Sequence, residues 1–132
     1  MPSTLWKWRR KRSSPCLENC QLDEVAARRV VIGGFSDGAS YAISLGLLNG
    51  DLFKGVMAFS PGFFIDGPWV GKPQFFIAHG KHDRMLPIET CGRRIAADLN
   101  AHAYGVTLTE FDGGHEIPAD VLRGGFRWLG SL

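Results

Sequence analysis

The chain has 132 residues and a formal net charge of +2 at pH 7, and it is 45% hydrophobic and 21% charged. These values fit one domain with a buried core, and they exclude wholesale disorder. The apolar runs are far shorter than the roughly 20 residues that a membrane span needs, so we expect no transmembrane segment. Three cysteines are too few for a disulfide scaffold, and nothing resembles a secretory signal, so we expect a reducing, cytoplasmic setting.

Charge is distributed unevenly along the chain. Residues 1–30 hold seven Lys and Arg against three Asp and Glu, or +4, whereas residues 31–132 hold eight against ten, or −2. All 17 glycines lie at or after Gly33. We therefore expect a basic, disordered segment over residues 1–22 and a folded domain over residues 23–132. The basic segment is also typical of nuclear-import signals or transit peptides, but we expect no nucleic-acid partner.

Apolar runs of the buried-strand type alternate with helical patterns along most of the chain. The predicted strands are residues 30–35, 55–59, 74–78 and 106–111. The predicted helices are residues 17–29, 37–49, 88–103 and 118–129. A loop broken by Pro and Gly, residues 60–73, separates the second strand from the third. This alternation predicts an α/β fold with a mainly parallel sheet, in which ligands bind beyond the carboxyl ends of the strands.

The first predicted strand ends in the pattern Gly-x-Ser-x-Gly, which residues 34–38 form. Between a strand and a helix this pattern is a nucleophile elbow, in which a tight turn projects the hydroxyl of Ser36 into the site. The flanking glycines remove side chains that would clash across the turn. The backbone N–H groups at the start of the helix, beginning with that of Asp37, can stabilise an oxyanion. The structural alternative is a glycine-rich helix entry with an incidental serine.

Candidates for an acid and a base follow the third and fourth predicted strands. A serine nucleophile needs an imidazole that accepts its proton and a carboxylate that orients the imidazole. Ser36, Asp83 and His115 occur in the order Ser, Asp, His, and each follows a predicted strand. Asp112 is a weaker candidate for the acid because it lies only three residues from His115. Asp66, after the second strand, is a third choice.

The remaining histidines and cysteines do not form a convincing metal site. His79, His82 and Asp83 lie close together in the sequence, but nothing supplies a fourth ligand at a suitable spacing. Cys16 and Cys20 have no second cysteine pair. We therefore expect no metal, and we interpret His79 and His82 as hydrogen-bonding residues of the turn that contains the acid.

Three segments of the chain resemble a known family. They are RVVIGGFSDGA at residues 29–39, HGKHDRMLP at residues 79–87 and FDGGH at residues 111–115. In this order they are similar to the C-terminal half of the α/β-hydrolase fold, and most similar to the phospholipase/carboxylesterase family, which includes acyl-protein thioesterases. The resemblance implies a three-layer α/β fold with a mainly parallel sheet, truncated on its N-terminal side so that about four strands remain.

The same resemblance implies a role for each residue of the site. Ser36 is the expected nucleophile, Asp83 the orienting acid and His115 the base. The expected reaction is the hydrolysis of carboxylic esters or thioesters, with a small-molecule or lipid acyl substrate and without a cofactor. Ser36 is followed by Asp37, where thioesterases tend to carry Gln, and this departure argues against protein depalmitoylation.

Apolar residues near the predicted site are candidates for an acyl pocket. They lie beside the nucleophile, in the loop after the second strand, and beside the acid. These residues are Phe35, Phe63, Phe64, Trp69, Met85 and Leu86. Ordinary core or crossover packing is the structural alternative for them.

The family's fold begins with several strands before the elbow, whereas here only about 30 residues precede it. They contain no glycine and no strand-like run, so the second oxyanion donor has no candidate. Loss of one donor typically costs about 10²–10³ in rate. A sheet without its first strands also exposes an edge that invites self-association. A catalytically inert fragment or an interaction module is therefore the alternative to a serine hydrolase.

Overall fold

The computed structural model describes residues 30–132, and four strands form one sheet in this part of the chain. They are β1 (Val30–Phe35), β2 (Phe53–Phe59), β3 (Gln74–Gly80) and β4 (Val106–Phe111). Their order in the sheet is β1-β2-β3-β4, and each neighbouring pair is parallel. The predicted α/β fold with a mainly parallel sheet is confirmed. The basic segment predicted over residues 1–22 and the helix predicted over residues 17–29 lie outside the described residues.

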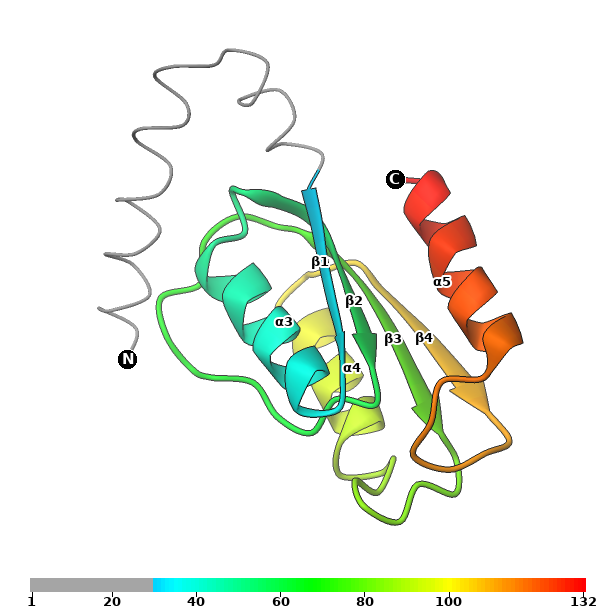
Figure 1. The fold of residues 1–132 in the computed structure, drawn as a ribbon. Coiled ribbons are helices and arrows are strands. Elements are labelled where there is room, and N and C mark those ends of the chain that lie inside the picture. The colour runs from blue at the N-terminus through cyan, green and yellow to red at the C-terminus, as the bar shows by residue number, and fades with distance from the viewer. Residues whose placement is uncertain (1–29) are drawn as a thin grey trace.

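Helices cover both faces of this sheet, which gives three layers (Figure 1). They are α3 (Asp37–Leu48), α4 (Gly92–Ala101) and α5 (Ala119–Gly130). α3 packs on β1 and β2 and α4 on β3 and β4, whereas α5 lies on the opposite face. The prediction that α4 begins at residue 88 was wrong by four residues. Residues 88–91 form a separate turn, because Arg93 N–H at the start of α4 donates to the carbonyl of Ile88, five residues back, instead of four residues back as in an α-helix.

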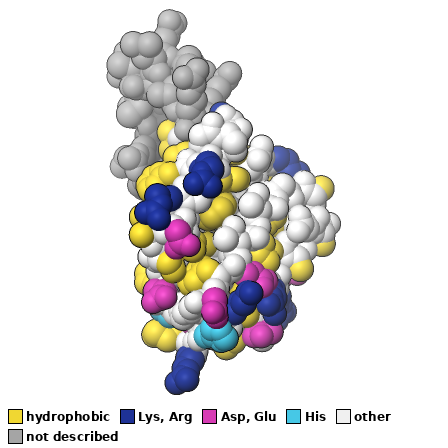
Figure 2. Space-filling model, turned by 90° about the vertical axis from the view of Figure 1, so that its right-hand side faces the viewer, with side chains coloured by type: hydrophobic (Ala, Val, Ile, Leu, Met, Phe, Trp, Pro, Cys, Tyr) yellow, Lys and Arg dark blue, Asp and Glu magenta, His cyan; other side chains and the backbone are white. Residues whose placement is uncertain are grey.

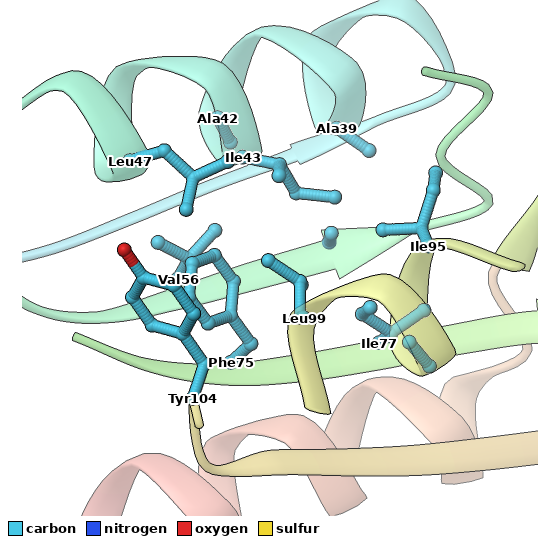
Figure 3. Close-up of a cluster of buried hydrophobic side chains, with 12 residues drawn as sticks. Ala39, Ala42, Ile43, Leu47, Val56, Phe75, Ile77, Ile95, Leu99 and Tyr104 are labelled. Atoms are coloured by element: carbon cyan, nitrogen blue, oxygen red, sulfur yellow. The ribbon is translucent and has the colours of Figure 1, made fainter. Parts of the chain in front are cut away.

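Two clusters of buried side chains hold the layers together. The larger cluster lies between the sheet and the helices α3 and α4 (Figure 3), and comprises Ala39, Ala42, Ile43, Leu47, Val56, Ala58, Phe75, Ile77, Ile95, Ala96, Leu99 and Tyr104. The smaller cluster, on the side of α5, comprises Met57, Phe59, Phe76, Ala78 and Val121. Because both of their faces are covered, β2 and β3 are buried along most of their length, as is typical of parallel sheets.

β1 is an edge strand of the described sheet. Within residues 30–132 it pairs only with β2, and its Val30 and Phe35 side chains are 42% and 38% exposed. Figure 2 shows the molecule from the side of α5, where hydrophobic side chains lie at the surface among charged ones. Phe126 of α5 is an exposed hydrophobic residue. In this part of the chain the helices are too short or too polar to cross a membrane.

Candidate active site

Ser36 lies in the turn between β1 and α3 with a strained backbone. Its φ is 58° and its ψ is −119°, a conformation that residues other than glycine rarely adopt. The Ser36 N–H donates to the carbonyl of Phe59 at 2.9 Å, which ties the turn to the end of β2. A Cβ at Gly34 would come within 2.3 Å of the Gly38 carbonyl oxygen, whereas a Cβ at Gly38 would meet nothing within 4 Å. The first glycine of the elbow is therefore sterically required, and the second is not.

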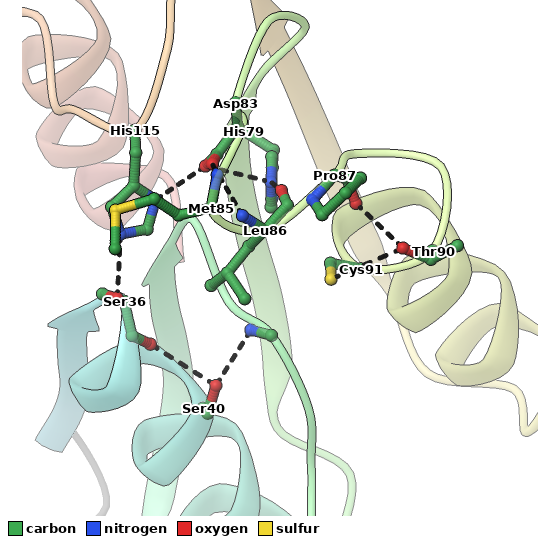
Figure 4. Close-up of polar contacts among 11 residues, drawn as sticks. Ser36, Ser40, His79, Asp83, Met85, Leu86, Pro87, Thr90, Cys91 and His115 are labelled. Atoms are coloured by element: carbon green, nitrogen blue, oxygen red, sulfur yellow. Dashed lines mark hydrogen bonds and ion pairs between the residues drawn. The ribbon is translucent and has the colours of Figure 1, made fainter.

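The Ser36 hydroxyl lies at one end of a continuous series of hydrogen bonds (Figure 4). Ser36 Oγ lies 2.9 Å from His115 Nε2, and His115 Nδ1 lies 2.7 Å from Asp83 Oδ2. An imidazole with its proton on Nδ1 donates to the carboxylate and leaves Nε2 free to accept the serine proton. Because the Ser36 hydroxyl makes no capping bond to α3, it remains available to His115. The structure thus brings together the three residues that the sequence predicts for the triad.

Asp83 is held as a buried carboxylate in the turn after β3. Its Oδ1 accepts the N–H groups of Met85 at 3.0 Å and Leu86 at 2.8 Å, and its side chain is fully buried. Burial alone would raise the pKa of the Asp83 carboxyl. The hydrogen bonds from Leu86 N–H and His115 lower the pKa by more than burial raises it, so the pKa lies below its ordinary value. The carboxylate therefore stays charged and fixed in direction opposite His115.

The two other candidates for the acid lie elsewhere. Asp112 Oδ1 lies 2.6 Å from His82 Nε2 in an exposed pair. Asp66 lines a surface pocket together with Trp69 and His102. Neither carboxylate is brought to His115.

Ser36 directly precedes α3, so the N-terminus of this helix adjoins it. Asp37 is the first residue of the helix, so its N–H has no carbonyl partner within the helix. Such an N–H, together with the positive end of the helix dipole, is suited to stabilising a negative oxygen that develops next to the serine.

Three of the predicted pocket residues contact His115 or Asp83. The Phe35 ring packs against the His115 ring at 4.9 Å between centroids. Phe63 is 47% exposed, and Met85, two residues after Asp83, is 72% exposed. Leu86 packs against the loop after β2, because a Cβ at Gly62 would come within 3.2 Å of both of its methyl groups. Phe35, Met85 and Leu86 together make an apolar rim, whereas the Phe63 ring lies against Tyr41 of α3 at 6.5 Å between centroids.

The other two pocket candidates, Phe64 and Trp69, are not brought to the triad. Their rings pack against each other at 5.6 Å and contact the larger core cluster. The Val70 N–H donates to the carbonyl of Leu47, near the C-terminal end of α3. Leu47 lies roughly 16 Å along the helix axis from Ser36, at 1.5 Å per residue. Core packing, the alternative given for these two residues, therefore describes them, because the loop carries Trp69 to the opposite end of the helix.

Sequence reasoning missed two serines on α3 that fasten the loop after β2. Ser40 Oγ accepts the N–H groups of Gly62 at 2.9 Å and Phe63 at 3.2 Å. Ser44 Oγ accepts the N–H of Ile65 at 3.0 Å. Both side chains are 1% exposed. Hydroxyls four residues apart on an otherwise apolar helix face were the available signal, since buried hydroxyls need partners.

Metal ligands are absent from the described part of the chain. No group of three or more His, Cys, Asp or Glu side chains in residues 30–132 is placed to hold an ion. Cys16 and Cys20 lie outside these residues, and Cys91 is a buried free thiol.

Comparison with known proteins identifies a family and proteins of similar fold. The model of the phospholipase/carboxylesterase family matches residues 12–124, whereas no curated protein matches the chain. The solved structure of esterase PE8 is 24% identical and covers 92% of this chain, with a TM-score of 0.68. The Bacillus cereus carboxylesterase is 23% identical over 83% of this chain, with a TM-score of 0.70. The Zea mays acyl-protein thioesterase 2 is 18% identical over 75% of this chain, with a TM-score of 0.62.

The solved structures are longer than the part that they share with this chain. The match covers 60% of esterase PE8, 56% of the Bacillus cereus enzyme and 54% of the Zea mays enzyme. The likeness therefore establishes the fold of the shared part, and the family model adds the sequence pattern. Because that pattern extends over residues 12–124 and includes both the elbow and the two loops that follow β3 and β4, the chain belongs to the phospholipase/carboxylesterase family.

Proposed function

We propose that this chain is a serine hydrolase that cleaves carboxylic ester or thioester bonds. The observation that carries the proposal is the hydrogen-bonded series from the Ser36 hydroxyl through His115 to the buried carboxylate of Asp83, at 2.9 and 2.7 Å. Its order and direction are those that a serine nucleophile requires. Membership of the phospholipase/carboxylesterase family supports the same class of reaction.

The first half of the proposed reaction forms an acyl-enzyme. Ser36 Oγ attacks the carbonyl carbon of the substrate as its proton passes to His115 Nε2. The negative charge moves to the carbonyl oxygen, which the Asp37 N–H faces at the start of α3. As the tetrahedral intermediate collapses, the bond to the leaving oxygen or sulfur breaks, and His115 returns the proton to the leaving group. Asp83 stabilises the imidazolium throughout.

The second half releases the acid by the same groups. His115 Nε2 takes a proton from water, and the resulting hydroxide attacks the acyl carbon. The bond between that carbon and Ser36 Oγ then breaks, and the proton returns to the serine. No metal or redox cofactor enters this cycle, because proton transfer and electrostatic stabilisation suffice for acyl transfer.

The apolar rim supports a substrate with a hydrophobic acyl group. Its side chains adjoin both His115 and the turn that carries Asp83, so an acyl chain attached to the scissile carbonyl would contact them. We therefore propose small-molecule or lipid acyl esters and thioesters as the substrate class. We also propose residues 23–132 as the hydrolase part of the chain and a cytoplasmic location, which the free Cys91 thiol favours.

A fluorophosphonate probe and a chromogenic acyl ester test the proposal together. The unmodified chain should be labelled at Ser36 and should turn over the ester, whereas Ser36→Ala should lose both. Loss of the nucleophile in a triad lowers kcat by on the order of 10⁶. Ser131→Ala is the matched control, because Ser131 lies exposed at the end of α5 and should leave labelling unchanged. A folded chain that resists the probe and does not turn over the ester would refute the proposal.

The alternative is a catalytically inert module that associates through its sheet edge. The exposed residues of β1 favour it, and so does the match to only 51–65% of the length of the solved structures. It predicts oligomers in size-exclusion chromatography with light scattering, together with no labelling of Ser36. A monomer that unfolds cooperatively and reacts with the probe would contradict it.

A further inference from the structure

His79 is a buried histidine that the proposed mechanism does not use. It lies near the end of β3, and its side chain is fully buried. His79 Nε2 lies 2.6 Å from the carbonyl oxygen of Leu86 and 3.4 Å from Asp83 Oδ2. His79 Nδ1 is also buried, and it has no hydrogen-bond partner among the described residues. The imidazole thus has one well-paired nitrogen, which faces the acid turn, and one unpaired nitrogen, which faces away.

These contacts determine the tautomer of His79. A carbonyl oxygen only accepts hydrogen bonds, so the 2.6 Å contact requires the proton on Nε2. The same Nε2–H points toward the carboxylate of Asp83. Nδ1 then carries a lone pair and no proton, which agrees with the lack of an acceptor beside it. His79 therefore donates through Nε2 and His115 through Nδ1, with the carboxylate of Asp83 between these two nitrogens.

Leu86 connects His79 to the acid through its backbone. Its carbonyl accepts from His79, and its N–H donates to Asp83 Oδ1 at 2.8 Å. A shift of the Leu86 backbone would therefore move the donor that holds Oδ1. Without His79, the turn would lose its bond to β3, and Asp83 would lose the neighbouring N–H near Oδ2. Both losses would change the orientation of the Asp83 carboxylate, and neither would remove a contact with the substrate.

We propose that His79 is a positioning residue for the triad, which acts through Leu86 and Asp83 to aim the carboxylate at His115. Its effect on turnover depends on the hydrolase function proposed above, whereas its effect on the His115–Asp83 bond does not. His79 touches neither Ser36 nor the oxyanion region, so its substitution should lower kcat and leave KM nearly unchanged. Misplacement of a catalytic group by about 1 Å can cost on the order of 10² in rate.

Two substitutions at residue 79 separate positioning from simple core packing. His79→Leu keeps an apolar side chain but removes the donor, and we expect kcat to fall by about 10- to 100-fold. His79→Gln offers an amide N–H near the position of Nε2, and we expect kcat to remain within about threefold of the parent. A merely structural role would instead lower the unfolding temperature of both variants without a preferential loss of kcat in His79→Leu.

Gly92→Ala perturbs the same ring without changing residue 79. A Cβ at Gly92 would lie 2.6 Å from His79 Nδ1 and 2.9 Å from its Cβ, so the alanine must push the imidazole toward the acid turn or tilt it away. We expect kcat to fall here too, by about tenfold. This variant decides the question if His79→Leu does not fold.

Nitrogen-15 NMR of the imidazoles gives a readout that does not depend on turnover. In the unmodified chain the shifts should show a proton on Nε2 of His79 and on Nδ1 of His115. His79→Leu and Gly92→Ala should change the Nδ1 shift of His115, whereas His79→Gln should largely preserve it. A proton on Nδ1 of His79, or a His115 signal that is the same in all variants, would overturn the proposal. A chain with the expected shifts but without turnover would leave His79 as assigned and refute only the hydrolase function.

Discussion

Two His–Asp pairs join the same two loops of this protein, and only one of them reaches the proposed nucleophile, Ser36. In one pair His115, from the loop after β4, lies 2.7 Å from Asp83 in the turn after β3. In the other pair the partners are exchanged, since His82 comes from the turn after β3 and Asp112 from the loop after β4, at 2.6 Å. The distances are nearly equal. The side chains of His82 and Asp112 are 69% and 87% exposed, whereas that of Asp83 is fully buried.

This contrast shows that a short His–Asp distance does not make a triad. Water screens an exposed pair, whereas a buried carboxylate acts on its neighbour at a lower effective dielectric constant. Asp83 is also fixed by two backbone N–H groups, and its histidine faces Ser36 at 2.9 Å. The exposed pair of His82 and Asp112 instead links the two loops at their solvent-exposed side.

The largest expected difference between the pairs is in turnover. Asp83→Asn should lower kcat by on the order of 10⁴, because the amide cannot hold His115 in the tautomer that accepts the serine proton. Steady-state hydrolysis of an acyl ester measures the effect, with Asp112→Asn as the matched variant. If the two variants lost activity equally, the distinction between the pairs would be mistaken.

Gly80→Ala should disturb both pairs at once. A Cβ at Gly80, the last residue of β3, would come within 2.3 Å of the Gly114 carbonyl oxygen and 2.4 Å of that of Gly113. The loop that carries His115 must therefore move away from the acid turn. We expect a loss of about 10² in kcat, because displacement of a catalytic group by about 1 Å has effects of this size. The same assay measures it, and parental activity would show that the loop tolerates the displacement.

The two pairs should also differ in how they affect the pH dependence of stability. The pKa of Asp83 is lowered in the folded chain, so its charge stabilises the fold above its unfolded pKa, near 4, and this contribution is lost as the pH falls through the lower folded pKa. Asp83→Asn should therefore flatten the loss of stability below about pH 4. Thermal unfolding followed against pH, with Asp112→Asn for comparison, measures the slopes. Parallel curves for the parent and Asp83→Asn would contradict this expectation.

The smallest effect is expected from the exposed pair itself. Asp112→Asn should change kcat/KM by about twofold or less, because solvent-exposed ion pairs contribute little. Added salt should reduce even this difference. Kinetics of the parent and the variant at low and high ionic strength provide the test. A large loss of kcat/KM that persists at high salt would mean that the pair of His82 and Asp112 positions His115.

The strands and the meeting of Ser36, Asp83 and His115 could be predicted because their signals are local. A short apolar run and a Gly-x-Ser-x-Gly turn are each contained in a few residues, and the chain order of Ser36, Asp83 and His115 follows from the alternation of strands and helices. The first turn of α4 could not be separated from the residues before it, because Ile88 continues the apolar pattern. The hydrogen bond from Arg93 N–H to the carbonyl of Ile88, which spans five residues instead of four, distinguishes that turn.

The loop after β2 contains residues whose positions local sequence patterns could not predict. Phe63 and Trp69 are both aromatic residues of one loop, yet Phe63 lies near the start of α3 and Trp69 lies at its far end. Bonds that span more than 20 residues decide this, from Phe63 N–H to the Ser40 hydroxyl and from Val70 N–H to the Leu47 carbonyl. Composition favours a pocket and a core equally for such residues, so the sequence could not separate them.

The bond between Ser36 and His115 joins residues that are 79 positions apart, one after β1 and the other after β4. Closing a flexible loop of that length costs on the order of 4 kcal/mol in chain entropy, so this contact is not formed early in folding. β2 and β3 lie between the two ends in the sheet, and they must pair before the ends can meet. On refolding from denaturant, reactivity of Ser36 would therefore return after the helical signal, and it would report the last stage of assembly of the sheet.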